Sequence, residues 1–145
     1  MSKLSMSKQE REAFLAALHV GVLAVDQPDG PALLTPIWYR YAPGGAIEFN
    51  TEGSSEKVRL LERAGHASLC AQREELPYAY VTVEGRVEID LTDQATRVDI
   101  ATRYLGTPAG IEYVDANPDA DDVVVRLHPT RWRTIDFAKL DLAGG

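Results

Sequence analysis

Six short strand-like segments, most of them joined by connections too short for helical crossovers, restrict this chain to few folds. Turn signals such as QPDG and APGG separate the early segments and predict a three-stranded meander, and the last segment is expected to break near Pro129. Parallel strands need connections of a dozen or more residues, which are mostly missing here. The pattern predicts a mainly β fold, a six-stranded antiparallel barrel with a few helices. The segments are GVLAVD, ALLTPIWYRY, AIEFNT, HASLCAQ, AYVTVEGRVEI and DDVVVRLHPTRWRTIDF.

Helices are indicated by capping signals on both sides of the early strands. Ser7 and Glu10 have the spacing of a capping box, which predicts a helix over about 7–18 with Leu18 on its apolar face. The run EKVRLLERAG predicts a second helix that ends at Gly65, since glycine is the usual C-cap residue.

A third helix is expected over about 93–105, with Asp90 or Thr92 as its cap. The stretch that follows, GTPAGIEYVDANPDADD, is acidic and rich in turn formers, and it is interpreted as a surface loop.

Composition excludes several classes of protein. With 145 residues and 45% hydrophobic content the chain is expected to be one domain, residues 1–145. The net charge of -7 argues against nucleic-acid binding through a basic field. A lone cysteine, Cys70, is expected to be buried, and the three histidines lack metal-ligand spacing, so no metal site is predicted. Without a signal peptide or a long apolar run, a cytoplasmic protein with no membrane contact is expected.

The segment TEGSSEKVR has the composition of an anion-binding loop that opens a helix. Thr51 and Ser55 offer hydroxyl groups, and Lys57 and Arg59 add positive charge near the free N–H groups of the helix start. Together with the apolar TPIWY segment before it, the loop predicts a site for a phosphorylated aromatic cofactor. Because Lys57 and Arg59 point to different helix faces, a solvated basic pair remains the alternative.

The chain resembles the flavin split-barrel family of pyridoxamine 5'-phosphate oxidase-like proteins in the order of six segments. These are LHVGVLAV, TPIWY, IEFNT, S-x-K-x-R, ASLC and YVTVEGRVEI. It looks most like the branch of deazaflavin (F420)-dependent oxidoreductases, and the resemblance covers about residues 10–137. It implies a homodimer of six-stranded antiparallel split barrels with a cofactor groove at the interface. Glu56 stands where the oxidase itself commonly has a basic residue, which weakens the case for an ordinary FMN pocket. Because the oxidase's substrate-binding extensions also have no counterpart in this sequence, oxidation of pyridoxamine phosphate is not expected.

The resemblance also implies cofactor-binding residues. The phosphate contacts would be Thr51, Ser55 and Lys57, with Arg59 as an added basic residue. The ring would lie beside Thr35, Pro36, Ile37 and Trp38, and Tyr80 would replace a glutamine of the family. Pro36 cannot donate from its nitrogen, so it is expected on an edge strand or at a bulge.

The function implied is transfer of a hydride from reduced F420 to a small organic acceptor with an activated C=C or C=N bond. An FMN-dependent oxidoreductase on the same scaffold is the first alternative, and a non-catalytic cofactor-binding or haem-binding protein is the second. No catalytic residue is assigned, because the chemistry would belong mainly to the cofactor. The proton could come from water or from Tyr78 or Tyr80.

Overall fold

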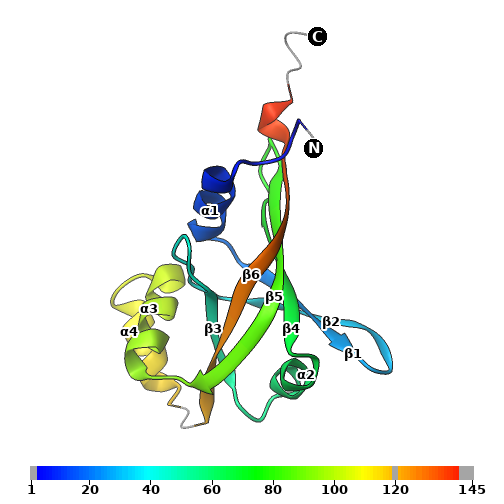
Figure 1. Ribbon diagram of the computed structural model, residues 1–145. Coiled ribbons are helices and arrows are strands. Elements are labelled where there is room, and N and C mark those ends of the chain that lie inside the picture. Colours follow the sequence, from blue (N-terminus) through cyan, green and yellow to red (C-terminus); the bar gives the residue numbers. More distant parts are fainter. Residues whose placement is uncertain (1–2, 119–120, 141–145) are drawn as a thin grey trace.

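The computed structural model describes residues 3–118 and 121–140, which form a curled sheet with helices around its edges (Figure 1). The strands are β1 (Gly21–Gln27), β2 (Gly30–Ile37), β3 (Ile47–Glu52), β4 (His66–Arg73), β5 (Ala79–Leu91) and β6 (Asp122–Asp136). The helices are α1 (Lys8–Ala16), α2 (Glu56–Ala64), α3 (Gln94–Leu105), α4 (Ala109–Ala116) and the short 3₁₀ helix η1 (Phe137–Lys139).

All neighbouring strands are antiparallel, in the order β2-β1-β4-β5-β6-β3. The prediction of a mainly β, six-stranded antiparallel split barrel with a few helices is therefore confirmed. The prediction of a three-stranded meander is wrong. β3 does not pair with β2; it pairs with β6 from Ile47 opposite Leu127 to Glu52 opposite Asp122. After Ile37 the chain leaves β2 and crosses to the far edge of the sheet, which short-range turn signals do not reveal.

The two edge strands, β2 and β3, come together at one point and then separate. A β-bridge joins Arg40, just after β2, to Glu48 in β3. Continuing that antiparallel register would pair Trp38 with Asn50, but the strand pairs of the described residues include no such pair. The sheet is thus split beside the bridge. Pro36 lies on an edge strand, as expected.

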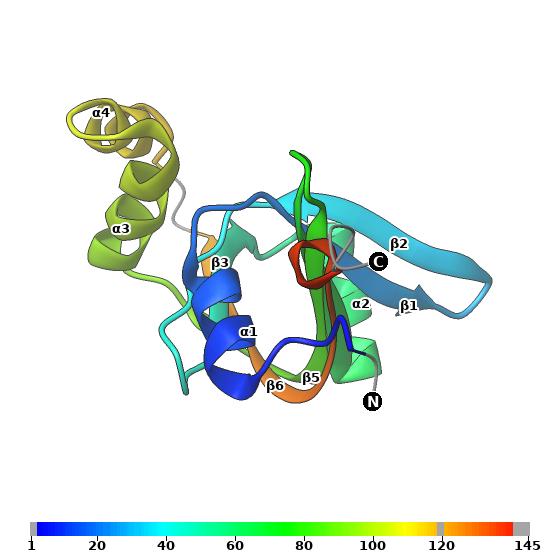
Figure 2. The ribbon, with the colours of Figure 1, turned by 90° about the horizontal axis from the view of Figure 1, so that it is seen from above.

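The core lies on the inner face of the curled sheet. Alternate residues of the strands point inward, and α1 closes one end of the barrel through the fully buried Leu15 (Figure 2). The hydroxyl of buried Tyr39 donates to the carbonyl of Leu15 at 2.7 Å, so Tyr39 belongs to the core. Other members of the core include Leu23, Val25, Ile47, Phe49, Leu61, Leu69, Val81, Val83, Val125 and Leu127.

The last strand is not broken at Pro129. β6 continues through it with a β-bulge: Glu84 of β5 pairs with Arg131 and Gly85 with Pro129, so Thr130 of β6 is the extra residue. At Gly85 a Cβ atom would lie 1.7 Å from the carbonyl oxygen of His128, so only glycine permits this approach.

The first two helices follow the predicted capping signals. The capping box of Ser7 and Glu10 is present, and α2 ends at Gly65 with φ 74°, in the left-handed region. α1 stops earlier than expected, at Ala16, because Ala17 is extended. Leu18 is consequently 56% exposed and does not lie on a packed helix face.

Two expectations about the region after β5 need correction. α3 is capped by neither Asp90 nor Thr92; the Asp93 carboxylate accepts from the Thr96 N–H at 2.7 Å. The proposed surface loop contains α4, which packs antiparallel to α3. At Gly110 a Cβ atom would lie 2.6 Å from Thr102 Cγ2, so this glycine allows the two helices to approach closely.

Cys70 was expected to be buried, but it is not. It is half-exposed on the outer face of the sheet, where it is the register partner of Val22 in β1 and Thr82 in β5.

Candidate functional site

A cavity of about 760 Å³ opens where the edge strands separate. The end of β2 forms one wall and the end of β3 the other, while α3 and α4 close the side away from the sheet (Figure 2). The N-terminal turn of α2 closes the end next to β3. The split in the barrel therefore produces a hollow that is large enough for a small-molecule cofactor.

The polar end of the cavity is built from β3 and α2. Lys57 Nζ lies 3.3 Å from Thr51 Oγ1, and Ser55 caps α2 by accepting from the Val58 N–H at 3.3 Å. Within the described residues Lys57 forms no ion pair with a carboxylate. Burial lowers the pKa of Lys57, and the charge of Glu52 opposes this shift. A half-buried cation with only a hydroxyl partner suits an anionic ligand.

Asn50 adds an amide to the same end. The hydroxyl of Thr92, just after β5, donates to Asn50 Oδ1 at 2.7 Å. That contact occupies the amide oxygen, so the Nδ2 hydrogens remain as donors beside the cavity.

The opposite end is aromatic and apolar. Trp38 stacks on Tyr104 of α3, with ring centroids 4.9 Å apart and planes 6° apart. Tyr113 of α4 lies 5.8 Å from Trp38 and is tilted by 51°. Tyr104 is itself fixed, because its hydroxyl donates to the His19 carbonyl at 2.6 Å and accepts from the Tyr39 N–H at 3.0 Å.

A second cation in the cavity wall, Arg97 of α3, is already paired. Its Nε donates to Asp122 Oδ2 at 3.1 Å, and its Nη2 donates to the carbonyl of Asn117. The side chains of Arg97 and Asp122 are only 13% and 12% exposed. The pair joins α3 to the start of β6, so it holds the helical wall and leaves Lys57 as the cation available to a ligand.

Six of the nine residues predicted for the cofactor are brought together in this cavity. They are Pro36, Ile37, Trp38, Thr51, Ser55 and Lys57. Thr35, Arg59 and Tyr80 are not among the residues that line it. Thr35 is half-buried in β2, and Tyr80 lies on the outer face of β5, 38% exposed.

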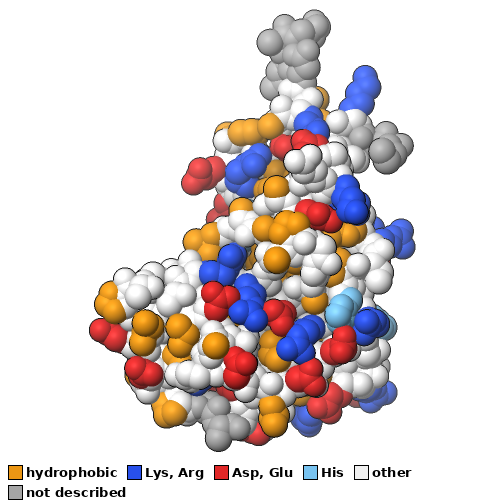
Figure 3. All heavy atoms as spheres, turned by 60° about the vertical axis from the view of Figure 1, so that its left-hand side comes forward, with side chains coloured by type: hydrophobic (Ala, Val, Ile, Leu, Met, Phe, Trp, Pro, Cys, Tyr) orange, Lys and Arg blue, Asp and Glu red, His pale blue; other side chains and the backbone are white. Residues whose placement is uncertain are grey.

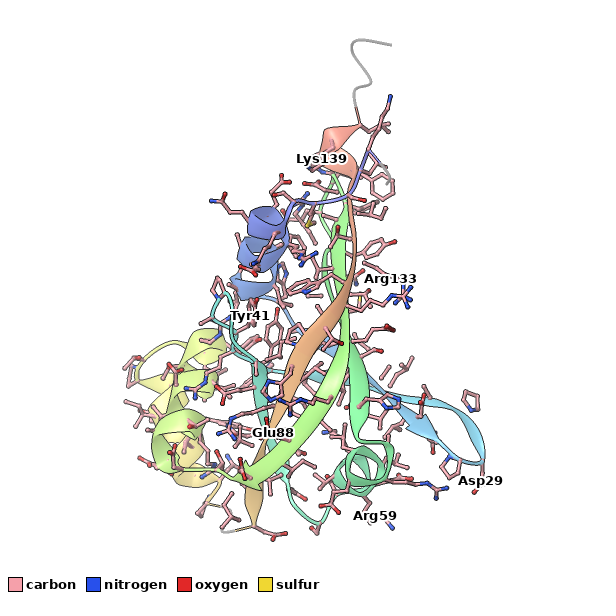
Figure 4. All side chains as sticks on the ribbon, viewed as in Figure 1. Asp29, Tyr41, Arg59, Glu88, Arg133 and Lys139 are labelled. Carbon is pink, nitrogen blue, oxygen red and sulfur yellow. The ribbon has the colours of Figure 1, made fainter. Side chains whose placement is uncertain are left out.

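Arg59 faces a different hollow of about 280 Å³, between α2 and the tip of the β1–β2 hairpin. Asp29 of this tip lines the same hollow, and Figure 4 shows Arg59 beside α2, on the side away from α3 and α4. Lys57 and Arg59 therefore lie on different faces of α2, as expected.

The helical wall was missed at the sequence level, although α3 carried a signal. Arg97, Ile100, Ala101 and Tyr104 have the i, i+3, i+4, i+7 spacing of one helix face. All but Tyr104 line the cavity, and Tyr104 supports Trp38. Tyr113 and Val114 come from α4, which was interpreted as a loop.

The described residues show neither a metal-binding cluster nor a membrane-spanning helix. The described part of the chain contains no group of three or more His, Cys, Asp or Glu side chains that could hold a metal ion. Across residues 3–118 and 121–140, no helix has the length and apolar character that crossing a membrane requires.

Comparison with solved structures finds the same fold in several proteins. A conserved hypothetical protein from Mycobacterium tuberculosis, Rv2991, is 29% identical over 98% of this chain and 92% of its own, with a TM-score of 0.81. An F420 reductase is 26% identical over 84% of this chain and 94% of its own, with a TM-score of 0.68.

A FAD-binding protein from Mesorhizobium loti shares the fold at 19% identity, with a TM-score of 0.65 and coverage of 89% and 92%. No curated protein matches the sequence. The sequence model of the pyridoxamine 5'-phosphate oxidase family matches residues 7–136, almost the whole chain. The chain therefore belongs to the pyridoxamine 5'-phosphate oxidase family.

Proposed function

We propose that this protein is an oxidoreductase that uses the deazaflavin coenzyme F420 and passes a hydride from its reduced form to a small organic acceptor. The observation that carries the proposal is Lys57, a half-buried ammonium group at the polar end of the cavity with Thr51 as its hydrogen-bond partner. Desolvating a cation without an anionic partner is unfavourable. A bound phosphate would offset that cost.

The chain's own residues have separate tasks in this proposal. Lys57, Thr51 and Ser55 would hold the phosphate group, and Asn50 would donate a further hydrogen bond. The backbone of β2 near Pro36 and Ile37 would lie along the ring edge, since no described strand pairs with that edge of the sheet. The cofactor supplies the hydride chemistry when bound; the protein orients the reactants and excludes water.

The similarity to an F420 reductase at 26% identity supports the deazaflavin over FMN. An FMN-dependent oxidoreductase remains the second candidate, since the same donors fit either phosphate. A haem protein is less favoured, because none of the described lining residues is a histidine.

We also propose that two copies of the chain form a homodimer, with the cofactor cavity at the interface between them. The proposed location of the protein is the cytoplasm. The outer face of the sheet carries exposed apolar side chains that a second copy would cover. They include Val22, Leu34 and Tyr80.

Parallel titration with F420 and FMN, followed by fluorescence, tests the choice of cofactor. We expect tighter binding of F420, and oxidation of reduced F420 when an activated enone or imine is added. Tighter binding of FMN would favour the second candidate. Failure to bind either cofactor would overturn the proposal.

A further inference from the structure

The amide of Asn50 has a defined orientation beside the cavity. Asn50 lines the cavity from β3, and its Oδ1 accepts a hydrogen bond of 2.7 Å from the Thr92 hydroxyl. An asparagine amide carries its acceptor oxygen and its two donor hydrogens on separate arms. Since Thr92 holds the oxygen, the NH₂ arm remains for a ligand. Thr92 itself is not among the described residues that line the cavity.

Thr92 reaches Asn50 from the far side of β6. This strand lies between β5 and β3, and its Val124 is the register partner of both Asp90 and Asn50. Thr92 follows β5, and its N–H donates to the Asp122 carbonyl at 3.3 Å, which extends the pairing with β6. The hydrogen bond between the side chains of Thr92 and Asn50 therefore spans the width of β6.

An ion-pair bridge holds the same three strands next to this hydrogen bond. Arg126 of β6 lies 2.5 Å from the Asp90 carboxylate and 2.8 Å from the Glu48 carboxylate. Asp90 comes two residues before Thr92, and residues at i and i+2 share one face of a strand. Glu48 likewise comes two residues before Asn50. Acidic and basic side chains are interspersed over the face of the molecule shown in Figure 3. The bridge keeps β5 and β3 at the spacing that the neighbouring hydrogen bond requires.

The orientation of the amide decides what this part of the wall attracts. Two carboxylates, Glu52 and Asp122, also line the cavity. An Asn50 oxygen turned toward the cavity would add to the negative potential there and repel an anion. The NH₂ group has the opposite effect, because it donates to the oxygens of an anion. Whatever fixes the amide therefore contributes to ligand specificity.

We propose that Thr92 is a positioning residue of the cofactor site. Its hydroxyl holds the Asn50 amide with the NH₂ group toward the cavity, and this orientation favours a phosphate-bearing ligand over the same ligand without phosphate. The inference rests on the proposed function, in which Asn50 donates to the cofactor phosphate. Because Thr92 acts through Asn50, loss of its hydroxyl should change the preference for phosphate and leave the affinity for the ring unchanged.

The preference for phosphate is the ratio of two dissociation constants. FMN is compared with riboflavin, and F420 with its phosphate-free chromophore, each titrated into the full-length protein and followed by fluorescence. Thr92→Val keeps the shape of the side chain and removes the hydroxyl, whereas Thr92→Ser keeps the hydroxyl. Thr102→Val is the matched control, because its hydroxyl donates to the Asp99 carbonyl of α3 at 3.1 Å and it does not line the cavity.

We expect Thr92→Val to lower the preference for the phosphate-bearing ligand roughly 2- to 10-fold, the size of one hydrogen bond. Thr92→Ser and Thr102→Val should retain the preference of the parent protein. Asn50→Ala should lower it too, and adding Thr92→Val to Asn50→Ala should have no further effect. Circular dichroism establishes that each variant is folded, and Thr92→Ala replaces Thr92→Val if the latter is not.

A second measurement needs no cofactor. Asn50 and Asn117 are the asparagines of the chain, so labelling with side-chain ¹⁵N-asparagine gives two NH₂ signals, which Asn50→Ala assigns. The probe is inorganic phosphate. We expect phosphate to shift the Asn50 signal in a saturable way in the parent protein, and to do so at higher concentration in Thr92→Val.

The inference is overturned if Thr92→Val leaves the ratio unchanged, if it weakens both ligands of a pair equally, or if its effect persists in Asn50→Ala. An Asn50 signal that does not respond to phosphate also overturns it. If the protein binds neither cofactor but phosphate shifts the Asn50 signal in a manner that depends on Thr92, the positioning role is supported and the proposed function fails. If a cofactor binds with a phosphate preference that Thr92→Val does not alter, the proposed function is supported and the positioning role fails.

Discussion

Arg40 and Glu48 are joined through both backbone and side chain. The Arg40 N–H donates to the Glu48 carbonyl at 2.9 Å, and the Glu48 N–H donates back at 3.0 Å. Arg40 Nε also lies 2.9 Å from Glu48 Oε1, while the other carboxylate oxygen is 2.8 Å from Arg126 Nε. These contacts hold the two sheet edges together and set the point where the split begins.

Replacing Glu48 with Gln should destabilise the fold. The carboxylate is about one-fifth exposed and serves two guanidinium groups, so we expect the free energy of unfolding to fall by about 1.5–3 kcal/mol. Urea denaturation measures this change. Glu62→Gln, on the exposed face of α2, is the control and should stay within about 0.5 kcal/mol of the parent protein. Equal effects of the two changes would show that the Arg40–Glu48 contact does not hold the edges.

Gly85→Ala should be among the most damaging single changes. The added methyl group would meet the His128 carbonyl oxygen at 1.7 Å, so β5 and β6 must separate at the bulge. We expect a loss of at least about 3 kcal/mol in thermal or urea unfolding. Gly30→Ala is the matched control, because nothing lies within 4 Å of its added Cβ atom. A mild effect at Gly85 would mean that the bulge can relax.

The sequence predicted those parts of the fold that depend on neighbouring residues. Capping by Ser7 and Gly65 was correct, because a cap is determined by the few residues around it. The pairing of β3 with β6 was missed, since Thr51 and its partner Val123 are far apart in the sequence. α4 was missed because turn formers such as Pro108 and Gly110 hid a helix that close packing on α3 supports.

The phosphate end of the candidate site was predictable because Thr51, Ser55 and Lys57 are close in sequence. The aromatic end was not, because it combines Trp38 with side chains of α3 and α4 that come more than 60 residues later. Arg59 was grouped with Lys57 because both are cations at the start of the predicted helix and because the family resemblance implies an added basic residue there. Helix geometry separates them, since residues at i and i+2 point in different directions.

The proposed homodimer can be tested through the outer face of the sheet. Leu34 in edge strand β2 is 65% exposed, and burying an aspartate there would be costly. We expect Leu34→Asp to shift the mass in light scattering from twice 15.9 kDa toward the monomer. Leu91→Asp, at an 81% exposed leucine at the end of β5, should leave the dimer intact. A parent protein that is monomeric and still binds cofactor would contradict the shared groove.

The affinity for a phosphate-bearing cofactor should fall at alkaline pH. Burial lowers the pKa of Lys57 below the ordinary lysine range, and a bound phosphate would raise it again. Binding is therefore strongest while Lys57 is protonated and weakens as pH rises through its lowered pKa. Lys57→Arg should remove this dependence between about pH 7 and 10, because arginine stays protonated there. An identical profile in Lys57→Arg would assign the titration to another group.

The most direct measurement is the affinity of F420 for Lys57→Ala compared with Arg59→Ala. Both changes remove a cation from α2, but only Lys57 lines the cavity between β2 and β3. We expect Lys57→Ala to weaken binding roughly 10- to 100-fold, as the loss of a charge-assisted hydrogen bond does, and Arg59→Ala to stay within about twofold. Unchanged affinity in Lys57→Ala, or a larger loss in Arg59→Ala, would contradict a phosphate site in the split of the barrel.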